Sequence, residues 1–281
     1  MILFYVNSNQ KNHARILLHL YNSYPGEKQI EPTNRFMRNS RLNLNASLIV
    51  FAGMIRGEGM IYHWCVAHNK RFFYVDHAYL DRGYNQGNPD NEWMRITDSA
   101  FTWTGMDDCT SDRWDTLFGN RYPIKPWMTN ASGNILVLPP SNASLYLFPY
   151  ASKWINGVVE EASKISRLPV VVREKPNQVV IDDMNNVVDR IEHTHTKTID
   201  EELATASLVI SFNSAVTVMA TILGIPSIVS NNAASFPVSQ SINTIINSPE
   251  PSREKWLHQL VHHQYTTTEM KDGTVWNQML K

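Results

Sequence analysis

Short apolar runs recur along the chain, and each is followed by a polar stretch. The runs that have the length of a β-strand are Ile2 to Val6, Leu48 to Ala52, Arg71 to Val75, Asn134 to Leu138, Pro169 to Val172, Leu208 to Ile210 and Ile225 to Val229. Nearly continuous apolar strands are typical of parallel sheets, because helices bury both faces of such a sheet. The pattern therefore predicts an α/β protein.

Helical segments lie between these runs, which predicts parallel sheets joined by right-handed crossovers. They are Ala14 to Tyr21, Met60 to Asn69, Lys153 to Ser166 and Ala215 to Leu223. Two such series in 281 residues suit two domains of about 100 to 150 residues each. We expect Rossmann-like domains over residues 1–126 and 127–281, with a last helix after Ser252 that closes the second domain or crosses back to the first.

The stretch from Leu208 to Ser230 carries the clearest loop signal. Its first strand ends at Ser211-Phe-Asn-Ser, whose side chains favour the N-terminus of a helix, and Gly224 with Pro226 ends that helix before the next strand. Hydroxyl groups and backbone N–H groups at a helix N-terminus favour an anion such as a phosphate. Ordinary helix capping accounts for the same residues, so both interpretations stay open at this point.

A second polar loop is predicted directly after the strand that ends at Val75. It contains Asp76, His77, Tyr79, Asp81 and Arg82. An aspartate–histidine pair can act as a general base, and an arginine can orient an anion. The alternative is that Asp76 caps a turn and that His77 packs in the core.

Basic side chains follow several of the predicted strands. The loop-like segment from Pro25 to Arg41 includes Lys28, Arg35, Arg38 and Arg41, and Arg56 comes after the second strand. Arg173 and Lys175 come directly after Val172. In open α/β sheets, ligands bind beyond the carboxyl ends of the strands. These cations are therefore candidates for contacts with phosphate groups.

The overall charge limits the kinds of partner. A net charge of −1 and a pI of about 6.8 give no general attraction to nucleic acid or to an anionic membrane, so a polyanion has to be bound by a local patch. Two cysteines, Cys65 and Cys109, are too few for a disulfide framework, which favours a reducing compartment. Neither a secretory signal nor an apolar run of about 20 residues is found, so we expect a cytoplasmic protein that spans no membrane.

The acidic and histidine pairs do not form a metal-binding motif. Asp107-Asp108 and Asp182-Asp183 are adjacent pairs, and neither makes the spaced acidic motif by which many metal-dependent sugar transferases hold a cation. His193, His195 and the pair His262-His263 lack cysteine partners and a His-Glu-x-x-His helix. We therefore expect no metal site and no bound cofactor.

Two α/β domains of this kind, facing one another across a cleft, resemble the GT-B class of glycosyltransferases. The stretch Ser211-Phe-Asn-Ser-Ala-Val-x-x-x-Ala-x-x-x-Gly-Ile-Pro-Ser-Ile resembles the donor-binding segment of capsule-polysaccharide and related glycosyltransferases. The first half contains Phe72-Phe-Tyr-Val-Asp-His-Ala-Tyr-Leu and Arg95-Ile-Thr-Asp-Ser-Ala-Phe. These two segments are similar to bacteriophage glycosyltransferases that modify hydroxymethylated pyrimidines in phage DNA.

The resemblance implies a metal-independent enzyme that moves a sugar from a nucleotide diphosphate sugar to a hydroxyl acceptor, foremost 5-hydroxymethylpyrimidine in DNA. It implies a general base, Asp76 or His77. The implied diphosphate ligands are Ser141, Arg173, Lys175, Ser211, Asn213 and Ser214. The implied DNA contacts are Arg35, Arg38, Arg41, Arg56 and Arg82, with Tyr79 stacking the flipped base. Two alternatives stay open: transfer to a surface glycan, and a non-catalytic module that binds a nucleotide or nucleic acid.

Overall fold

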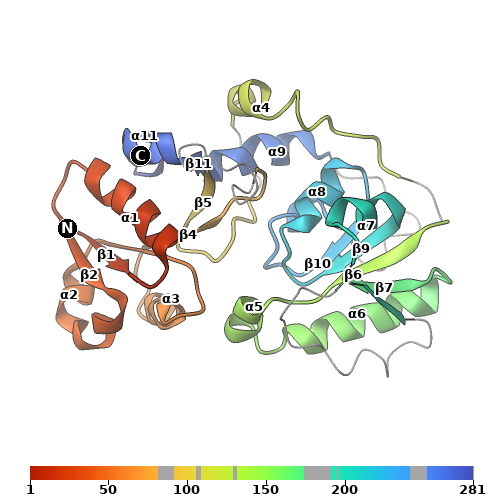
Figure 1. Ribbon diagram of the computed structural model, residues 1–281, viewed down its shortest axis with the longest axis horizontal. Helices are drawn as coiled ribbons and strands as arrows, with labels where there is room; N and C mark the ends of the chain where they lie inside the picture. Colours follow the sequence, from red (N-terminus) through yellow and green to blue (C-terminus); the bar gives the residue numbers. More distant parts are fainter. Residues whose placement is uncertain are drawn as a thin grey trace. The chain divides into compact units, whose positions relative to one another are not determined.

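The computed structural model describes residues 1–81, 92–105, 109–128, 132–173, 191–194, 196–240 and 252–280. The chain divides into two compact units, of which the first consists of Met1–Trp103 and His262–Lys281 and the second of Thr104–Val261. Each unit contains one β-sheet, as Figure 1 shows. A functional domain boundary between residues 126 and 127 stays a prediction, because compactness and function need not divide a chain at the same residue.

The first unit is built on a six-stranded sheet with the strand order β11-β5-β4-β3-β1-β2. Its strands are β1 (Ile2–Val6), β2 (Lys28–Pro32), β3 (Leu48–Ala52), β4 (Phe72–His77), β5 (Trp93–Asp98) and β11 (Gln264–Thr266). The first four run parallel, whereas β5 is antiparallel to β4 and β11 is antiparallel to β5. The parallel part places the carboxyl ends of β1, β3 and β4 along one edge.

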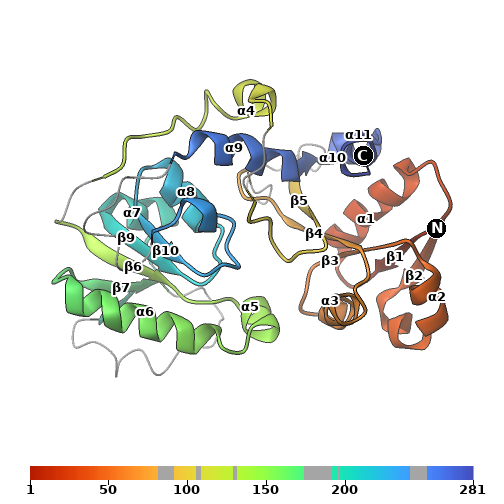
Figure 2. The ribbon, with the colours of Figure 1, turned by 180° about the vertical axis from the view of Figure 1, so that it is seen from behind.

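Helices cover both faces of this sheet, because successive side chains of a strand point to opposite sides. They are α1 (Lys11–Ser23), η1 (Thr33–Arg38), α2 (Ser40–Asn45), α3 (Glu58–Ala67), α10 (Thr267–Lys271) and α11 (Thr274–Met279). Phe4 packs edge to face against Trp276 of α11, whereas its neighbour Tyr5 packs against Phe36 of η1. Figures 1 and 2 accordingly show α1 and α11 on one side of the sheet and α2 and α3 on the other.

The second unit is built on a parallel five-stranded sheet with the order β10-β9-β6-β7-β8. Its strands are β6 (Asn134–Leu138), β7 (Val170–Arg173), β8 (Ile191–Thr194), β9 (Ala206–Ser211) and β10 (Ser227–Val229). Its helices are α4 (Asp112–Leu117), α5 (Asn142–Leu147), α6 (Ala151–Ile165), α7 (Ile199–Thr205), α8 (Val216–Ile222), η5 (Phe236–Val238) and α9 (Glu254–Leu260), and η6 (Val261–His263) joins the units. Ile155 of α6 packs on one face of the sheet, and Leu203 of α7 and Ala220 of α8 pack on the other. Both faces are therefore buried.

The predicted α/β class with two Rossmann-like units is confirmed, and β1, β3 and β6 have the bounds that the sequence predicts. Gly224 has the left-handed φ of +79° expected after α8. The segment from Pro25 to Arg41, for which the sequence predicts a loop, instead contains β2, η1 and the start of α2. Pairing with β1 stabilises β2, and the local pattern does not show this pairing. Among the described residues, no helix combines the length and the hydrophobicity that a membrane span requires.

Candidate functional site

Polar side chains of the first unit gather at the carboxyl ends of β1, β3 and β4. Asp76 and His77 are the last two residues of β4, and not loop residues as the sequence predicts, because both pair with β5. Asn7 follows β1, and Gly53 follows β3. His13 comes from the first turn of α1, the helix after β1. Sheet order therefore brings residues that are distant in sequence to one edge.

Three hydrogen-bond donors hold the carboxylate of Asp76. Nη2 of Arg95 and the hydroxyl of Tyr74 donate to Oδ2 at 2.9 and 2.7 Å, and the backbone N–H of His77 donates to Oδ1 at 2.8 Å. Burial alone would raise the pKa of Asp76, but the charges of Arg95 and His77 and the hydrogen bond from Tyr74 outweigh it and lower this pKa from 3.8 to about 2. Asp76 is therefore ionised at neutral pH and is a weak proton acceptor.

Arg95 is almost completely buried behind this carboxylate. Its side chain is 9% exposed, and its guanidinium carbon lies 5.8, 5.2 and 5.4 Å from the ring centres of Tyr74, Tyr79 and Phe101. Burial would lower the pKa of Arg95, but the negative charge of Asp76 outweighs burial and raises it. Arg95 is thus a fixed cation whose role is to keep Asp76 charged and in place.

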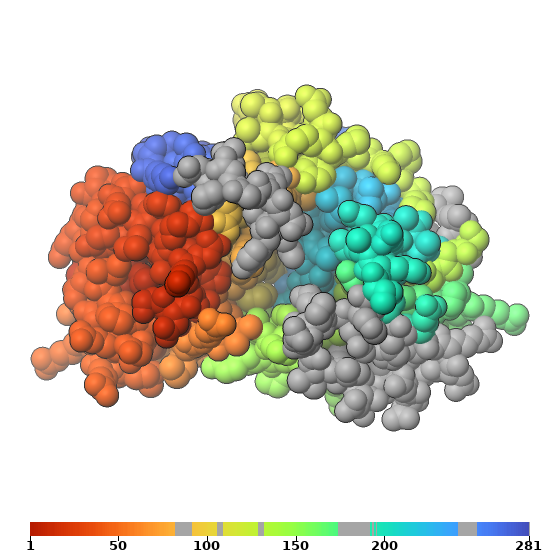
Figure 3. Space-filling model, in the orientation of Figure 1, coloured from red at the N-terminus to blue at the C-terminus, as the bar shows by residue number. Residues whose placement is uncertain are grey.

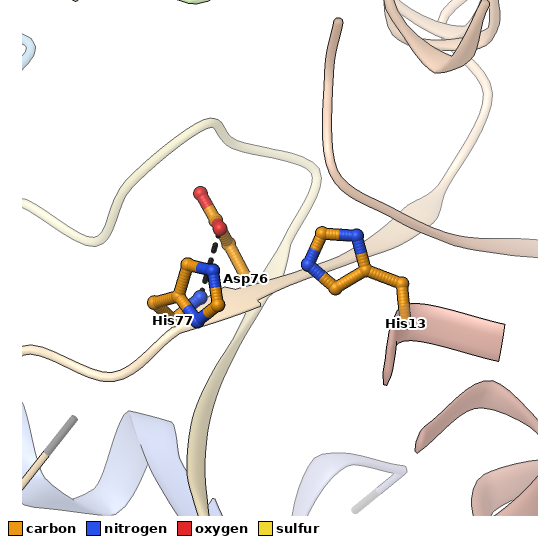
Figure 4. Close-up of side chains that lie close together, drawn as sticks. All are labelled: His13, Asp76 and His77. Atoms are coloured by element: carbon orange, nitrogen blue, oxygen red, sulfur yellow. Dashed lines mark hydrogen bonds between the residues drawn. The ribbon is translucent and has the colours of Figure 1, made fainter. Parts of the chain in front are cut away.

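His13 faces Asp76 and His77 from α1. The ring centres of His13 and His77 are 5.6 Å apart, and the ring planes are inclined by 42°. Nδ1 of His13 lies 2.8 Å from Oε1 of Gln10; in the tautomer with the proton on Nδ1, the ring donates to this oxygen and Nε2 is the acceptor. Figure 4 shows the second ring nitrogen of His13 pointing toward Asp76 and His77. The sequence analysis missed His13. The signal that could have identified it is its place at the start of the helix that follows β1, since this position lies near the carboxyl end of the strand.

Gly53 makes room for this arrangement. Its φ is +77°, and an added Cβ would lie 2.9 Å from both Cε1 and Nδ1 of His13 and 3.2 Å from Oε1 of Gln10. A side chain at this position would displace the His13–Gln10 pair and would also strain the backbone. The turn after β3 is therefore shaped to fit the imidazole.

The cluster contains the ligand types of a metal site. One oxygen of Asp76 and one ring nitrogen each of His13 and His77 lie within 4.8 Å of one another. No other group of histidine, cysteine, aspartate and glutamate side chains meets this condition in the part of the chain that the structure describes.

Tyr79 and Arg82 were also predicted to contact the acceptor. Tyr79 is 5% exposed, its hydroxyl lies 2.9 Å from Oγ1 of Thr102, and it accepts a hydrogen bond from the backbone N–H of Trp103. Stacking of this ring on a base stays a prediction, and it requires the ring to leave its buried position. Arg82 lies outside the described residues.

The other predicted acceptor arginines lie in the segments that follow β2 and β3 in the first unit. Arg35 and Arg38 lie on η1, Arg41 lies on α2, and Arg56 lies in the loop before α3. That loop lies against the start of η1, since a Cβ on Gly57 would be 3.4 Å from Cγ2 of Thr33. All four arginines are exposed, and none forms an ion pair with a described residue. Figure 3 shows this early part of the chain in red to orange at the molecular surface.

Four of the predicted donor residues of the second unit, Ser141, Ser211, Asn213 and Ser214, lie at the carboxyl ends of β6 and β9. Ser141 caps α5 by accepting a hydrogen bond from the backbone N–H of Ser144. The hydroxyl of Ser144 donates to Oδ1 of Asn213 at 2.7 Å. This bond joins the first turn of α5, the helix after β6, to the loop after β9. Nδ2 of Asn213 is buried and has no hydrogen-bond partner in the described part of the chain.

Two further serines, Ser211 at the end of β9 and Ser214 in the loop after it, shape the backbone of that loop. The buried hydroxyl of Ser211 donates to the carbonyl of Leu138 at 3.1 Å and accepts from the N–H of Ser214 at 3.1 Å. The hydroxyl of Ser214 accepts from the N–H of Val216 at the start of α8. Arg173 ends β7, the strand beside β6, and is part-buried. Lys175 lies outside the described residues.

Comparison with known proteins identifies solved structures that have a similar fold. No family model matches the sequence, and no curated protein matches it. Among solved structures, the chain is similar to Thermosulfurimonas dismutans KpsC, beta Kdo 2,7 transferase, with a TM-score of 0.56 and 11% identity over 98% of this chain and 99% of that chain. It is also similar to Thermosulfurimonas dismutans KpsC, beta Kdo 2,4 transferase, with a TM-score of 0.54 and 8% identity over 94% and 91%. At this identity the similarity concerns the fold alone, and the chain has the two-Rossmann-domain α/β fold of GT-B glycosyltransferases.

Proposed function

We propose that the chain is a glycosyltransferase that moves a sugar from a nucleotide diphosphate sugar to a hydroxyl group. The observation that carries the proposal is the similarity of fold to two Kdo transferases over nearly the whole chain. Because one fold can support many reactions, the residues at the carboxyl ends of the two sheets have to supply the chemistry.

The second unit binds the donor in this proposal. The backbone N–H of Ser141 and the hydroxyl of Ser214 donate to the diphosphate, and the buried Nδ2 of Asn213, which lacks a partner in the described part, donates to a phosphate oxygen. Arg173 and Lys175 neutralise the charge of the leaving group in place of a metal ion. Ser211 holds the loop, since both of its hydroxyl contacts are internal.

The first unit supplies the general base. Asp76 has a pKa of about 2, so it accepts a proton poorly at neutral pH. His77 follows it directly and is the better acceptor, while the negative charge of Asp76 stabilises the protonated imidazole. His77 takes the hydroxyl proton as the acceptor oxygen bonds to the anomeric carbon, and the nucleoside diphosphate leaves with the electrons of the broken bond.

The foremost acceptor in this proposal is a 5-hydroxymethylpyrimidine in DNA. It is supported by Arg35, Arg38, Arg41 and Arg56, four exposed cations without ion pairs to described residues on a chain of net charge −1. Such cations contact phosphates and position a duplex without reading its sequence. Arg82 and Tyr79 keep their proposed roles as a further phosphate contact and as the stacking ring.

The second candidate acceptor is a glycan hydroxyl. The similarity of fold to two Kdo transferases favours it, because neither of these enzymes is named for transfer to DNA. The surface arginines would then bind anionic groups of the glycan. The two acceptors differ in one measurable respect, since affinity for duplex DNA falls steeply with salt concentration.

One experiment separates these possibilities. The protein is incubated with a panel of nucleotide sugars and, in separate reactions, with hydroxymethylated DNA, unmodified DNA and oligosaccharides, and the digested products are weighed by mass spectrometry. Sugar on hydroxymethylated nucleosides alone supports the DNA acceptor, and sugar on oligosaccharides alone supports the glycan. The absence of both transfer and donor hydrolysis would leave the non-catalytic binding module.

Two variants test the residue roles. His77→Ala should lower kcat by about two to four orders of magnitude, the usual contribution of a general base. The control is His68→Ala, because His68 is exposed, ends α3 and stacks on Trp64, and it is not part of the cluster at the carboxyl ends of the strands. A His77→Ala enzyme with wild-type kcat would remove His77 from the base role.

A further inference from the structure

We propose that His13, Asp76 and His77 form a binding site for a divalent transition metal ion, with Zn²⁺ as the best-matched ion. The three side chains come from α1 and β4 and offer two imidazole nitrogens and one carboxylate oxygen (Figure 4). Zn²⁺ prefers these ligand types, and three protein ligands leave a fourth position for water or substrate. The sequence does not show the site, because no metal motif joins residues that only the fold brings together.

The surroundings of His13 are those of a metal ligand. A ligating histidine uses one nitrogen for the metal and donates the N–H of the other to an acceptor that fixes the ring. Gln10 provides this acceptor for Nδ1 at 2.8 Å, and Nε2 points toward the other two side chains. Gly53 packs so closely against the same ring that no side chain fits there. Two independent contacts thus hold the imidazole in the orientation that binding requires.

The carboxylate of Asp76 is held in a corresponding way. Tyr74 and Arg95 both donate to Oδ2, and within the described part of the chain Oδ1 accepts one hydrogen bond, from the backbone N–H of His77. A carboxylate oxygen accepts more than one contact, so Oδ1 retains capacity for a metal. Ligating carboxylates usually have such outer hydrogen bonds.

Small movements complete the coordination. The candidate ligand atoms lie within 4.8 Å of one another, whereas two nitrogen ligands of tetrahedral zinc are about 3.3 Å apart. Side-chain rotations that move the ring nitrogens of His13 and His77 by about 1 Å bring the three ligand atoms to these distances. The guanidinium of Arg95 opposes a second positive charge, so the expected affinity is lower than that of a structural zinc site.

Metal binding competes with the proposed catalytic role of His77. An imidazole whose nitrogen binds Zn²⁺ cannot accept a proton at that nitrogen, so the bound ion inhibits sugar transfer. This consequence rests on the proposed function, whereas metal binding itself does not. The binding measurement below contains neither donor nor acceptor, so its failure is distinguishable from a failure of the proposed function.

The test uses the untagged full chain after dialysis against a chelator. Co²⁺ is titrated while the visible absorption of the ion is recorded, and Zn²⁺ is titrated by calorimetry. We expect one ion per chain, the strong visible absorption of four-coordinate Co²⁺, and displacement of Co²⁺ by Zn²⁺. His13→Ala and the more conservative His13→Gln should each weaken binding at least about tenfold, with circular dichroism showing that the variants are folded.

Matched variants separate this site from general histidine binding. His68→Ala should leave Co²⁺ affinity and absorption unchanged, because its ring stacks on Trp64 of α3 and not on the cluster. Gly53→Ala should weaken binding by displacing His13. Absence of saturable binding overturns the proposal, as does binding that both folded His13 variants retain at full strength.

Discussion

The ion pair between Asp76 and Arg95 allows a quantitative test of the electrostatics at the strand ends. In Asp76→Asn the side chain keeps its shape and loses its charge. The native pKa of Asp76 is about 2 against 3.8 for the ordinary group, a shift that corresponds to about 2 kcal/mol of stability at neutral pH. Because the native pKa is lowered, this contribution is fully present above pH 4 and is lost as the pH falls toward 2. About half of it, roughly 1 kcal/mol, is lost by pH 3.

The assay is urea unfolding of wild type and Asp76→Asn near pH 7 and near pH 3, followed by circular dichroism. The destabilisation should be about 2 kcal/mol near pH 7 and about half as large near pH 3. Asp98→Asn is the matched control. Asp98, at the end of β5, forms an ion pair with Arg71, which precedes β4, and their side chains are 37% and 45% exposed. Such an exposed pair contributes less than about 1 kcal/mol at either pH. Equal destabilisation by Asp76→Asn at both pH values would refute the reasoning.

Three further predictions follow from single positions. Gly224→Ala should lower the free energy of unfolding by about 3 kcal/mol or more, because φ is +79° and the added Cβ would lie 2.0 Å from the carbonyl oxygen of Pro126; an unchanged melting temperature contradicts this. Ser144→Ala removes the hydrogen bond to Asn213 and should raise the KM for the donor by about tenfold with little change in kcat. An unchanged KM would show that this hydrogen bond does not shape the donor site. Burial raises the pKa of the Cys65 thiol to about 12, so iodoacetamide should label it only after unfolding, and mass spectrometry of the native protein would reveal any earlier reaction.

Local sequence predicts the strands whose residues are all buried. β3 has five buried residues in a row, and its pattern alone identifies both of its ends. β2 shows the opposite case, since Lys28–Pro32 alternates little and contains two charged residues and a proline. It is a strand because β1 offers unpaired backbone groups beside it. Edge strands of this kind depend on a partner that lies elsewhere in the chain.

The candidate site also contains residues that the local sequence predicts and residues that only the fold brings together. The donor loops were predicted because Ser141 and Asn213 each follow a recognisable strand, and the structure joins their loops through Ser144. His13 was missed, because a single histidine in a helix has no distinctive neighbours in sequence. The sequence analysis named Arg95 only as part of the segment that resembles bacteriophage glycosyltransferases. Its buried ion pair with Asp76 forms because β4 and β5 are neighbours in the sheet.

The sequence by itself determined that the chain forms two α/β units, where β1, β3, β6 and β10 end, and which polar residues lie at or near the ends of the predicted strands. These features depend on the period of apolar side chains and on local helix and turn preferences, which act over a few neighbouring residues. Only the tertiary structure decided that β4 lies beside β5 and that α1 turns His13 toward Asp76 and His77. Those contacts join residues from separate elements, because sheet pairing and helix packing, rather than nearness along the chain, set which side chains meet.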